Sequence, residues 1–298
     1  MKKIIALLMV MGMTLSLAAC GGTTASSETE SAQASEAETV SEATESEAVE
    51  SETSTTVSET AAATDDTLVV GFDQDFPPFG FVGDDGEYTG FDIEMAQEAA
   101  KIMGKEIVLQ PIDWDAKDLE LEAGTIDCIW NGFTINGRED AYTWTDAYMD
   151  NSQVVVTRVD SGINSLSDLA GKVVEVQKES SAESALNDDD HVDLLASFAQ
   201  LITVGDYNTA FMDLESGAVD AVAIDIGVAK FQIEGKEDTF KILDETVSTE
   251  QYGVGFLLGN TQLRDEVQAA MMELVETGVF AEISNEYFGY DVCILGDN

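Results

Sequence analysis

One ten-residue phrase occurs twice in this chain, as LEAGTIDCIW at 121–130 and as LESGAVDAVA at 214–223. Each copy starts with Leu-Glu-x-Gly, and a glycine in this position typically ends a helix. The apolar run that follows two or three residues later indicates a buried strand. The phrase therefore predicts the same helix-to-strand connection at two places. A separation of 93 positions is too wide for a solenoid repeat and favours two lobes of one α/β design.

The remaining pattern alternates strands and helices, as is typical of α/β folds. TLVVGFD (67–73) and EIVLQPI (106–112) predict strands, and FDIEMAQEAAKIMG (91–104) predicts a helix that its last glycine ends. A further helix is expected from about 116 to 123. SLSDLAGKVVEVQKESSAESAL (165–186) predicts a short helix, a strand and a serine-rich turn that opens another helix. Because α/β sheets bind ligands at the carboxyl ends of their strands, two such lobes can share one cleft.

The first 66 residues predict an export signal and a tether. Residues 1–20, MKKIIALLMVMGMTLSLAAC, place two lysines before a short apolar run and small residues before a cysteine, as in a secretory signal. The ending LAAC resembles the bacterial lipobox, which predicts a lipid on Cys20; a plainly secreted protein is the alternative. Residues 21–66 consist almost wholly of Ser, Thr, Glu and Ala and contain 12 acidic residues, so we expect a disordered tether.

The folded part is strongly acidic. From Thr67 onward the chain holds 47 of the 59 acidic residues and 11 of the 13 basic ones, a net charge of −36. This charge argues against nucleic acid and anionic membrane surfaces as partners. The remaining cysteines, Cys128 and Cys293, have no metal or redox spacing. We expect buried free thiols, with a disulfide between them as the alternative.

Ser180 and Ser181 stand where the second lobe is expected to open a helix. Hydroxyls and free N–H groups at a helix start attract carboxylates and phosphates. Simple capping of the helix is the alternative.

Four segments together resemble the extracellular amino-acid-binding proteins of bacterial ABC transporters. They are GFDQDFPPFGF with GEYTGFDIEMAQEAAK, DWDAKDLELEAGTIDCIWNGFTINGREDAYTWTDAY, DLAGKVVEVQKESSAESAL, and GAVDAVAID. The resemblance covers residues 67–298 and implies an α/β fold of the type II periplasmic-binding-protein kind, with two lobes joined by two crossover strands. It implies lobe 1 at 67–153 and 250–298 and lobe 2 at 154–249. QYGVGF (251–256) and helices from about 264 to 287 then complete lobe 1.

The resemblance also implies a site for a free amino acid, whose carboxylate and ammonium each need a partner once water is excluded. Arg138 is the candidate for the carboxylate, because a guanidinium pairs with it in two-pronged fashion. Thr134 precedes Arg138 by four positions, whereas the family spacing is five, so this loop is one residue shorter. Thr134 offers a hydroxyl, and the backbone at Asn131 and Gly132 offers a carbonyl. Asp225 corresponds to the carboxylate that pairs with the ammonium.

The side chain of the amino acid is expected to lie between two rings, Phe76 and Trp114. Asp73 is expected at the far end, where relatives contact polar or basic side chains. Glu179 replaces a glycine of the relatives; we expect it to point outward, with an added negative charge in the pocket as the alternative. Core packing is expected for the other rings of these segments, Phe79, Phe81 and Phe91. These features favour a polar or basic amino acid and leave glutamine, arginine, lysine, histidine and cystine open.

The resulting hypothesis is a lipid-anchored protein on the extracellular face of the cell membrane that delivers its amino acid to a permease with an ATPase. We expect a monomer without metal or other cofactor. Two alternatives remain: a dehydratase-type enzyme on the same fold, and a ligand sensor. Enzymes need a placed acid or base, and the one histidine, His191, lies in the acidic stretch NDDDHVD, where an exposed loop is expected. We therefore do not expect an enzyme.

Overall fold

A computed structural model describes residues 66–296 of the chain. The predicted signal, Cys20 and the tether up to residue 65 lie outside the described residues, so these predictions stay untested. Within residues 66–296, no helix combines the length and the apolar character needed to cross a membrane.

The first sheet has the strand order β5-β1-β6-β13-β7. It consists of β1 (Thr67–Phe72), β5 (Glu106–Pro111), β6 (Cys128–Ile129), β7 (Thr143–Trp144) and β13 (Gly255–Phe256). β5 and β6 run parallel to β1, and β13 is antiparallel to β6 and β7. The strands predicted at 67–73 and 106–112 are confirmed, and only the last residues of QYGVGF join this sheet. We call the elements around this sheet lobe 1.

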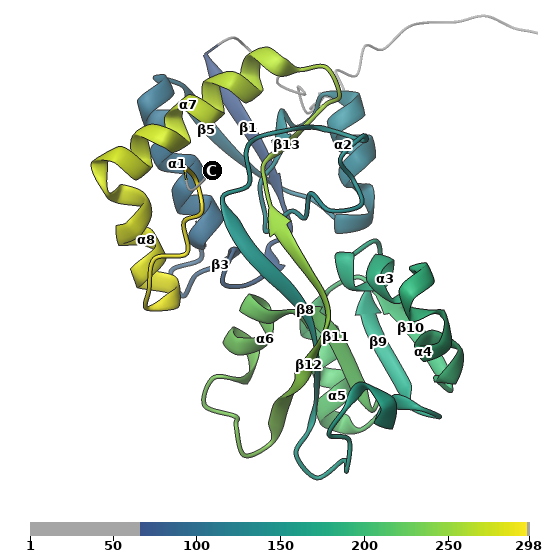
Figure 1. Ribbon diagram of the computed structural model, residues 1–298. Helices are drawn as coiled ribbons and strands as arrows, with labels where there is room; N and C mark the ends of the chain where they lie inside the picture. The colour runs from purple at the N-terminus through teal and green to yellow at the C-terminus, as the bar shows by residue number, and fades with distance from the viewer. Residues whose placement is uncertain (1–65, 297–298) are drawn as a thin grey trace, which may run out of the picture. The chain divides into compact units, whose positions relative to one another are not determined.

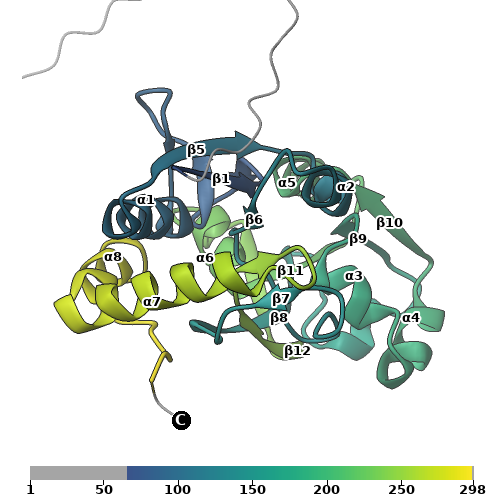
Figure 2. The same cartoon turned by 90° about the horizontal axis from the view of Figure 1, so that it is seen from above.

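Side chains on β1 alternate between two helical layers of lobe 1. Leu68 and Val70 belong to a core with helices α1 (Phe91–Met103), α7 (Thr261–Thr277) and α8 (Val279–Phe288), whereas Val69 packs with α2 (Lys117–Ala123) on the opposite face. Figure 2 shows α1, α7 and α8 on one side of β1 and α2 on the other. A small sheet lies beside them. It contains β2 (Asp75–Phe76), β3 (Gly80–Val82) and β4 (Tyr88–Thr89).

The second sheet has the order β10-β9-β11-β8-β12 and forms lobe 2. Its strands are β8 (Met149–Arg158), β9 (Val173–Gln177), β10 (Gln200–Val204), β11 (Ala221–Asp225) and β12 (Phe240–Tyr252). Four α-helices accompany it: α3 (Ser181–Leu186), α4 (Val192–Ser197), α5 (Tyr207–Ser216) and α6 (Ile226–Ile233). Three short 3₁₀ turns lie at Trp114–Ala116, Leu166–Leu169 and Asp189–His191. The stretch NDDDHVD (187–193) is exposed as expected except at His191, which is partly buried, and it forms a 3₁₀ turn followed by the start of α4.

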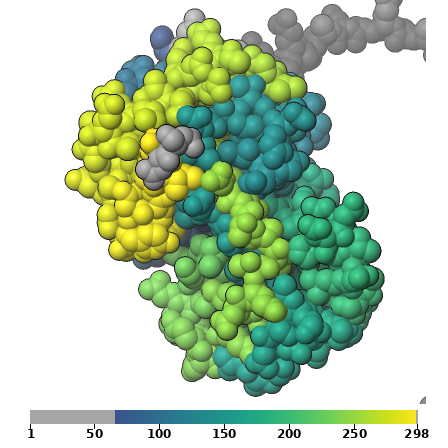
Figure 3. All heavy atoms as spheres, viewed as in Figure 1, coloured from purple at the N-terminus to yellow at the C-terminus, as the bar shows by residue number. Residues whose placement is uncertain are grey.

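Two long strands join the lobes. β8 and β12 pair antiparallel from Met149↔Tyr252 to Arg158↔Phe240, with irregular register between Ile242 and Ser248. Figure 1 shows them running from lobe 1 into lobe 2, and Figure 3 shows β12 at the surface between the lobes. The structure thus has the two α/β lobes and the two crossover strands that the sequence predicts. The lobe boundaries predicted near 153 and 250 fall inside these strands and stay a prediction.

The repeated phrase makes equivalent connections in the two lobes. Gly124 ends α2 and Gly217 ends α5, both in the left-handed conformation, at φ 71° and φ 79°. The aspartate of each phrase then binds the neighbouring strand: Asp127 Oδ2 accepts the Val69 N–H at 2.7 Å, and Asp220 Oδ2 accepts the Val173 N–H at 3.0 Å. The strand orders β5-β1-β6 and β10-β9-β11 match as well. The predicted two-fold use of one connection is confirmed.

The two cysteines of this part of the chain differ in burial. Cys128 on β6 is a fully buried free thiol, and burial raises its pKa well above the usual range. Cys293, in the segment after α8, is only partly buried. The prediction of burial is right for Cys128 and wrong for Cys293, because the C-terminal segment lies along the surface of lobe 1.

Candidate functional site

A cavity of about 10 Å³, roughly the space of one water molecule, lies where strand ends of both lobes meet. Lobe 1 contributes the ends of β1 and β6, and lobe 2 contributes the ends of β9 and β11. Eight of the ten residues predicted for the site line it: Asp73, Phe76, Trp114, Asn131, Gly132, Ser180, Ser181 and Asp225. The ninth lining residue, Gln177, was not predicted. Thr134 and Arg138 do not line the cavity.

Asn131 and Gly132 form the lobe 1 side of the cavity. The Asn131 side chain accepts the Asp73 N–H at 3.0 Å through Oδ1, while its Nδ2 is buried and has no hydrogen-bond partner among the described residues. Gly132 has a positive φ of 56° and donates its N–H to the fully buried Asp92. Burial raises the pKa of Asp92 to about 7 although this bond and Tyr148 oppose the shift. An unused amide donor is thus available at the first strand end.

Gly132 is constrained by its left-handed backbone conformation and by the lack of room for a side chain. A Cβ there lies 3.1 Å from the Phe76 ring and 3.2 Å from the Tyr252 ring. Replacement of Gly132 by alanine is expected to lower the free energy of unfolding by about 1–2 kcal/mol through the left-handed φ alone, and further through these contacts. The matched control is Gly137→Ala, with φ 80° and nothing within 4 Å of the added Cβ. Urea unfolding of both variants measures the difference, and equal losses would contradict the role of the ring contacts.

Asp73 and Gln177 connect the lobes inside the cavity. Gln177 Nε2 donates to Asp73 Oδ2 at 2.6 Å and to the Gly205 carbonyl at 3.0 Å, and Asp73 Oδ1 accepts the Asp75 N–H. Burial raises the pKa of Asp73 to about 6, and these hydrogen bonds oppose the shift. Gln177 is the last residue of β9, and Asn131 follows the last residue of β6 by two positions, so the strand-end position of Gln177 was the signal that could have found it.

The predicted rings border the cavity. Phe76 is buried and lies 5.7 Å from Phe79 and 6.0 Å from Tyr207, measured between ring centroids. Trp114 meets Phe133 edge to face at 5.4 Å. Of the rings assigned to the core, Phe79 and Phe91 are fully buried as predicted. The core prediction is wrong for Phe81, which is partly exposed. It packs outside the core on Phe231 of α6, with 5.6 Å between the ring centroids.

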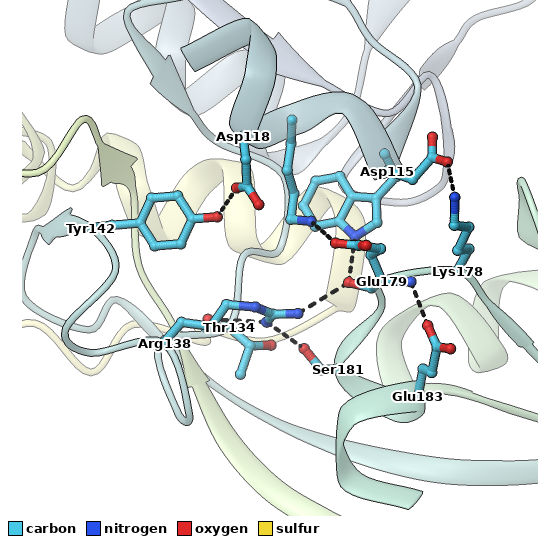
Figure 4. A network of polar contacts seen from close by, with 11 residues as sticks. Asp115, Asp118, Thr134, Arg138, Tyr142, Lys178, Glu179, Ser181 and Glu183 are labelled. Carbon is cyan, nitrogen blue, oxygen red and sulfur yellow. Dashed lines mark hydrogen bonds and ion pairs between the residues drawn. The ribbon is translucent and has the colours of Figure 1, made fainter. Parts of the chain in front are cut away.

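Arg138 lies beside the cavity and binds three uncharged oxygens. Its Nη1 donates to the Thr134 carbonyl at 3.3 Å and to Ser181 Oγ at 3.0 Å, and its Nη2 donates to the Glu179 carbonyl at 3.1 Å (Figure 4). The loop before Arg138, which the sequence predicts to be short, is closed by a hydrogen bond from the Arg138 N–H to the Ile135 carbonyl. Among the described residues, Arg138 forms no ion pair, so its charge is not matched by a carboxylate.

Glu179 is the only residue other than glycine with a positive φ, 61°, in the described part of the chain. This conformation is the physical reason why a glycine is suited to its place. Its carbonyl also accepts the Trp114 Nε1–H at 3.3 Å, and its carboxylate lies 3.3 Å from the ammonium of Lys117. Its carboxylate therefore contacts lobe 1 and does not line the cavity (Figure 4). Lys178 and Asp115 form a second ion pair between the lobes, at 2.6 Å.

The serines at the start of α3 have separate partners. Ser180 accepts the Glu183 N–H at 3.1 Å and caps the helix, which is the alternative that the sequence left open. Ser181 accepts from Arg138. Both also line the cavity.

Asp225 ends β11 and is buried in a network that the sequence did not predict. Its Oδ1 accepts from Asn151 Nδ2 at 2.7 Å, from Gln153 Nε2 at 2.8 Å and from the Tyr252 hydroxyl. The same two amides donate to Glu250 Oε1, at 2.7 and 2.8 Å. Burial, and then the charge of Glu250, raises the pKa of Asp225 to about 7. The partners of Asp225 lie on β8 and β12, which also carry other polar residues, so the sequence does not single these partners out.

An open, acidic groove of about 630 Å³ adjoins the cavity. Asp73 and Trp114 line both. The other carboxylates of the groove are Asp75, Asp113, Asp115, Glu120 and Asp206. Among residues 66–296, no three His, Cys, Asp or Glu side chains are grouped so that they could hold a metal ion. The groove therefore favours positive charge at the end of the cavity that Asp73 marks.

Known proteins resemble this chain in sequence and in structure. The L-cystine-binding protein TcyJ of Escherichia coli (strain K12) is 33% identical over 229 residues, which are 76% of this chain and 84% of that protein. The arginine-binding extracellular protein ArtP of Bacillus subtilis (strain 168) is 24% identical over 299 residues, 97% of this chain and 98% of that protein. A histidine-bound substrate-binding protein of an ABC uptake transporter from Streptococcus pneumoniae superposes with a TM-score of 0.74 at 33% identity and covers 77% of this chain and 95% of its own.

The family match extends over nearly all of both lobes. Residues 68–290 match the bacterial extracellular solute-binding proteins, family 3. This range includes every residue that lines the cavity and both crossover strands. The chain therefore belongs to the bacterial extracellular solute-binding proteins of family 3.

Proposed function

We propose that this protein captures a polar or basic amino acid outside the cell and delivers it to the permease of an ABC importer. The observation that carries the proposal is the pairing of the two repeated phrases. One leads to Asn131 and Gly132 and the other to Asp225, and all three residues line one cavity between the lobes. An α-ammonium bound at Asp225 forms an ion pair with its buried carboxylate, which has no basic partner among the described residues. The relatives named for cystine, arginine and histidine support an amino acid as the ligand.

The ligand carboxylate is assigned to the same end of the cavity as the ammonium, because both groups are bonded to the α-carbon of an amino acid. Arg138 approaches it from lobe 1, and Ser180 and Ser181 approach it from lobe 2. Arg138 already donates to Ser181, so a carboxylate that enters between them replaces an uncharged acceptor by a charged one. Phe76 and Trp114 lie on either side of the ligand side chain in this arrangement.

Asp73 and the acidic groove argue for a positively charged or polar side chain. A cation there is attracted by the carboxylates of the groove, and a neutral polar group can donate to Asp73. Rings beside a cation add a cation–π attraction of about 0.5–2 kcal/mol.

Closure of the lobes follows from where the contacts come from. The ammonium partner lies in lobe 2 and Arg138 lies in lobe 1, so only a closed arrangement neutralises both ligand charges. A ligand shifts a two-state equilibrium by its differential affinity for the two states. Gln177 with Asp73, and Arg138 with Ser181, are contacts of this closed kind.

The anchoring and assembly belong to the same proposal. We assign a lipid to Cys20, a flexible acidic tether to residues 21–66, and a position on the extracellular face of the cell membrane. The protein acts as a monomer whose closed lobes meet the permease and its ATPase. It performs no chemistry on its ligand and takes no cofactor.

A thermal-shift screen of the purified chain against the proteinogenic amino acids and cystine tests the proposal. A polar or basic amino acid at 100 times its dissociation constant is expected to stabilise the protein by about 2.7 kcal/mol. The matched control is the analogue of the same compound that lacks the α-amino group, which is expected to give no shift. If no amino acid shifts the melting temperature while a cyclic carboxylate is turned over, the protein is an enzyme of the dehydratase kind and the proposal is wrong.

A further inference from the structure

Two buried carboxylates on different elements share the same two amides. Asn151 Nδ2 and Gln153 Nε2 each donate to Asp225 Oδ1 and to Glu250 Oε1, at 2.7 to 2.8 Å. Asp225 is 4% exposed and Glu250 is 7% exposed. Asp225 belongs to the cavity, whereas Glu250 lies on the crossover strand β12 and does not line it. The two amides thus place a second negative charge directly behind the proposed ammonium partner.

No positive charge of the described chain balances this pair. Asp225 and Glu250 form no ion pair with a lysine or arginine among residues 66–296. The amides themselves are only half satisfied, because Asn151 Oδ1 and Gln153 Oε1 are buried without a hydrogen-bond partner. Two carboxylates with one set of neutral donors require a cation or a proton from elsewhere.

The other groups that face the pair are neutral. Tyr252 on β12 donates to Asp225, and Thr134 Oγ1 of lobe 1 donates to Glu250 Oε1 at 2.8 Å. Tyr207 on α5 also faces Asp225, and burial raises the pKa of both tyrosines well above 10. α6 begins directly after Asp225 with four uncharged residues. Glu250 is therefore the one charge close to Asp225 on the elements that surround it.

Resting on the proposed function, we infer that Glu250 is a positioning residue of the ammonium subsite that acts through Asp225. Its negative charge favours the protonated form of Asp225, with a proton taken from solvent, when the subsite is empty. When an α-ammonium binds, Asp225 and Glu250 together face it as two negative charges. The proton balance is simple. The carboxylic acid of Asp225 loses its proton to solvent, and the resulting carboxylate pairs with the incoming ammonium. No covalent bond to the ligand forms or breaks.

Ligand affinity then depends on pH through this proton. Because burial and the charge of Glu250 raise the pKa of Asp225 to about 7, a growing share of the empty protein carries this proton as the pH falls from 8 to 6, and the ligand must displace it. The apparent dissociation constant is expected to rise about tenfold from pH 8 to pH 6 in the unaltered protein. Replacement of Glu250 by glutamine removes the charge and keeps the size, so the rise is expected to begin at lower pH and to stay under about threefold over the same interval.

Isothermal titration with L-arginine and with L-cystine at pH 6, 7 and 8, in buffers of different ionisation enthalpy, measures the affinity and the protons released. Asp73, whose pKa is raised to about 6, titrates in the same cavity of both proteins, so the comparison is between the proteins at each pH. The matched control is Asp244→Asn, an exposed change on the same strand, which is expected to keep the pH profile of the unaltered protein. Equal pH profiles for Glu250→Gln and the unaltered protein overturn the inference.

A second measurement needs no ligand. A carboxyl group with a raised folded-state pKa stabilises the fold fully below its unfolded-state pKa and loses that contribution as the pH rises through the folded-state pKa. Between about pH 5 and pH 8, the melting temperature of the unaltered protein is therefore expected to fall by a few degrees relative to that of Glu250→Gln. If neither amino acid binds, the proposed function is wrong in its substrate, and this comparison still decides the role of Glu250. Parallel plots of melting temperature against pH for the two proteins overturn the inference about Glu250.

Discussion

Replacement of Asp225 by asparagine is expected to weaken amino-acid binding at pH 8 by at least about 100-fold. The ligand ammonium loses its buried counter-charge, and removal of one partner of a buried ion pair costs roughly 3–5 kcal/mol. The fold is expected to stay intact, because asparagine keeps the size of the side chain and removes the repulsion from Glu250. Titration calorimetry with the amino acid found in the thermal-shift screen measures the loss, and circular dichroism checks the fold.

Asp220→Asn is the matched control for this change. Asp220 precedes Asp225 by five residues, is partly exposed, and binds the Val173 N–H outside the cavity. Its replacement is expected to lower stability modestly and to leave the affinity within about threefold, since a single hydrogen bond contributes about 0.5–1.5 kcal/mol to stability. An affinity for Asp225→Asn within threefold of the unaltered protein would show that the ammonium binds elsewhere.

The order of elements could be predicted because local chemistry determines it. Gly124 and Gly217 end their helices through a local, left-handed backbone conformation. The apolar runs that follow them are then expected to form buried strands. The strand-end rule then placed Asn131, Gly132 and Asp225 in one cavity. The position of these residues could be predicted because it follows from the end of an element, which a sequence displays directly.

The partners of Asp225 were missed because they depend on pairing between distant strands. Asn151, Gln153 and Glu250 come together only through the register of β8 with β12, across almost 100 positions. Their polarity in buried strands is visible in the sequence, yet nothing local says which carboxylate they face. The partial exposure of Phe81 has the same origin, since its partner Phe231 belongs to the other lobe.

Glu179 illustrates how a departure from a family pattern acquires meaning only in three dimensions. The sequence left open whether the Glu179 side chain points outward or into the pocket. In the structure, both its backbone carbonyl and its carboxylate contact lobe 1. The left-handed backbone directs the carbonyl to Trp114 and Arg138, and the side chain reaches Lys117, whose side chain is 3% exposed. Several contacts between the lobes thus converge on one residue of lobe 2.

Replacement of Arg138 by alanine is the second change with a large expected effect, a loss of affinity of about 100-fold. The guanidinium has only uncharged acceptors in the described structure, Thr134 and Glu179 through their carbonyls and Ser181 through its hydroxyl. A ligand carboxylate supplies the missing charge, and hydrogen bonds to charged groups contribute about 1.5–3 kcal/mol each. Lysine at this position is expected to restore little, because it lacks the fork that binds a carboxylate through two atoms.

Ser181→Ala separates this role from a purely structural one. It removes the hydroxyl that links Arg138 to α3 and leaves the guanidinium in place, so it is expected to weaken binding by only about two- to tenfold. If Arg138 served only to connect the lobes, the two variants would lose affinity equally, and an ester analogue without a free carboxylate would bind the unaltered protein as well as the amino acid does. A large loss for Arg138→Ala together with rejection of the ester would assign the ligand carboxylate to this arginine.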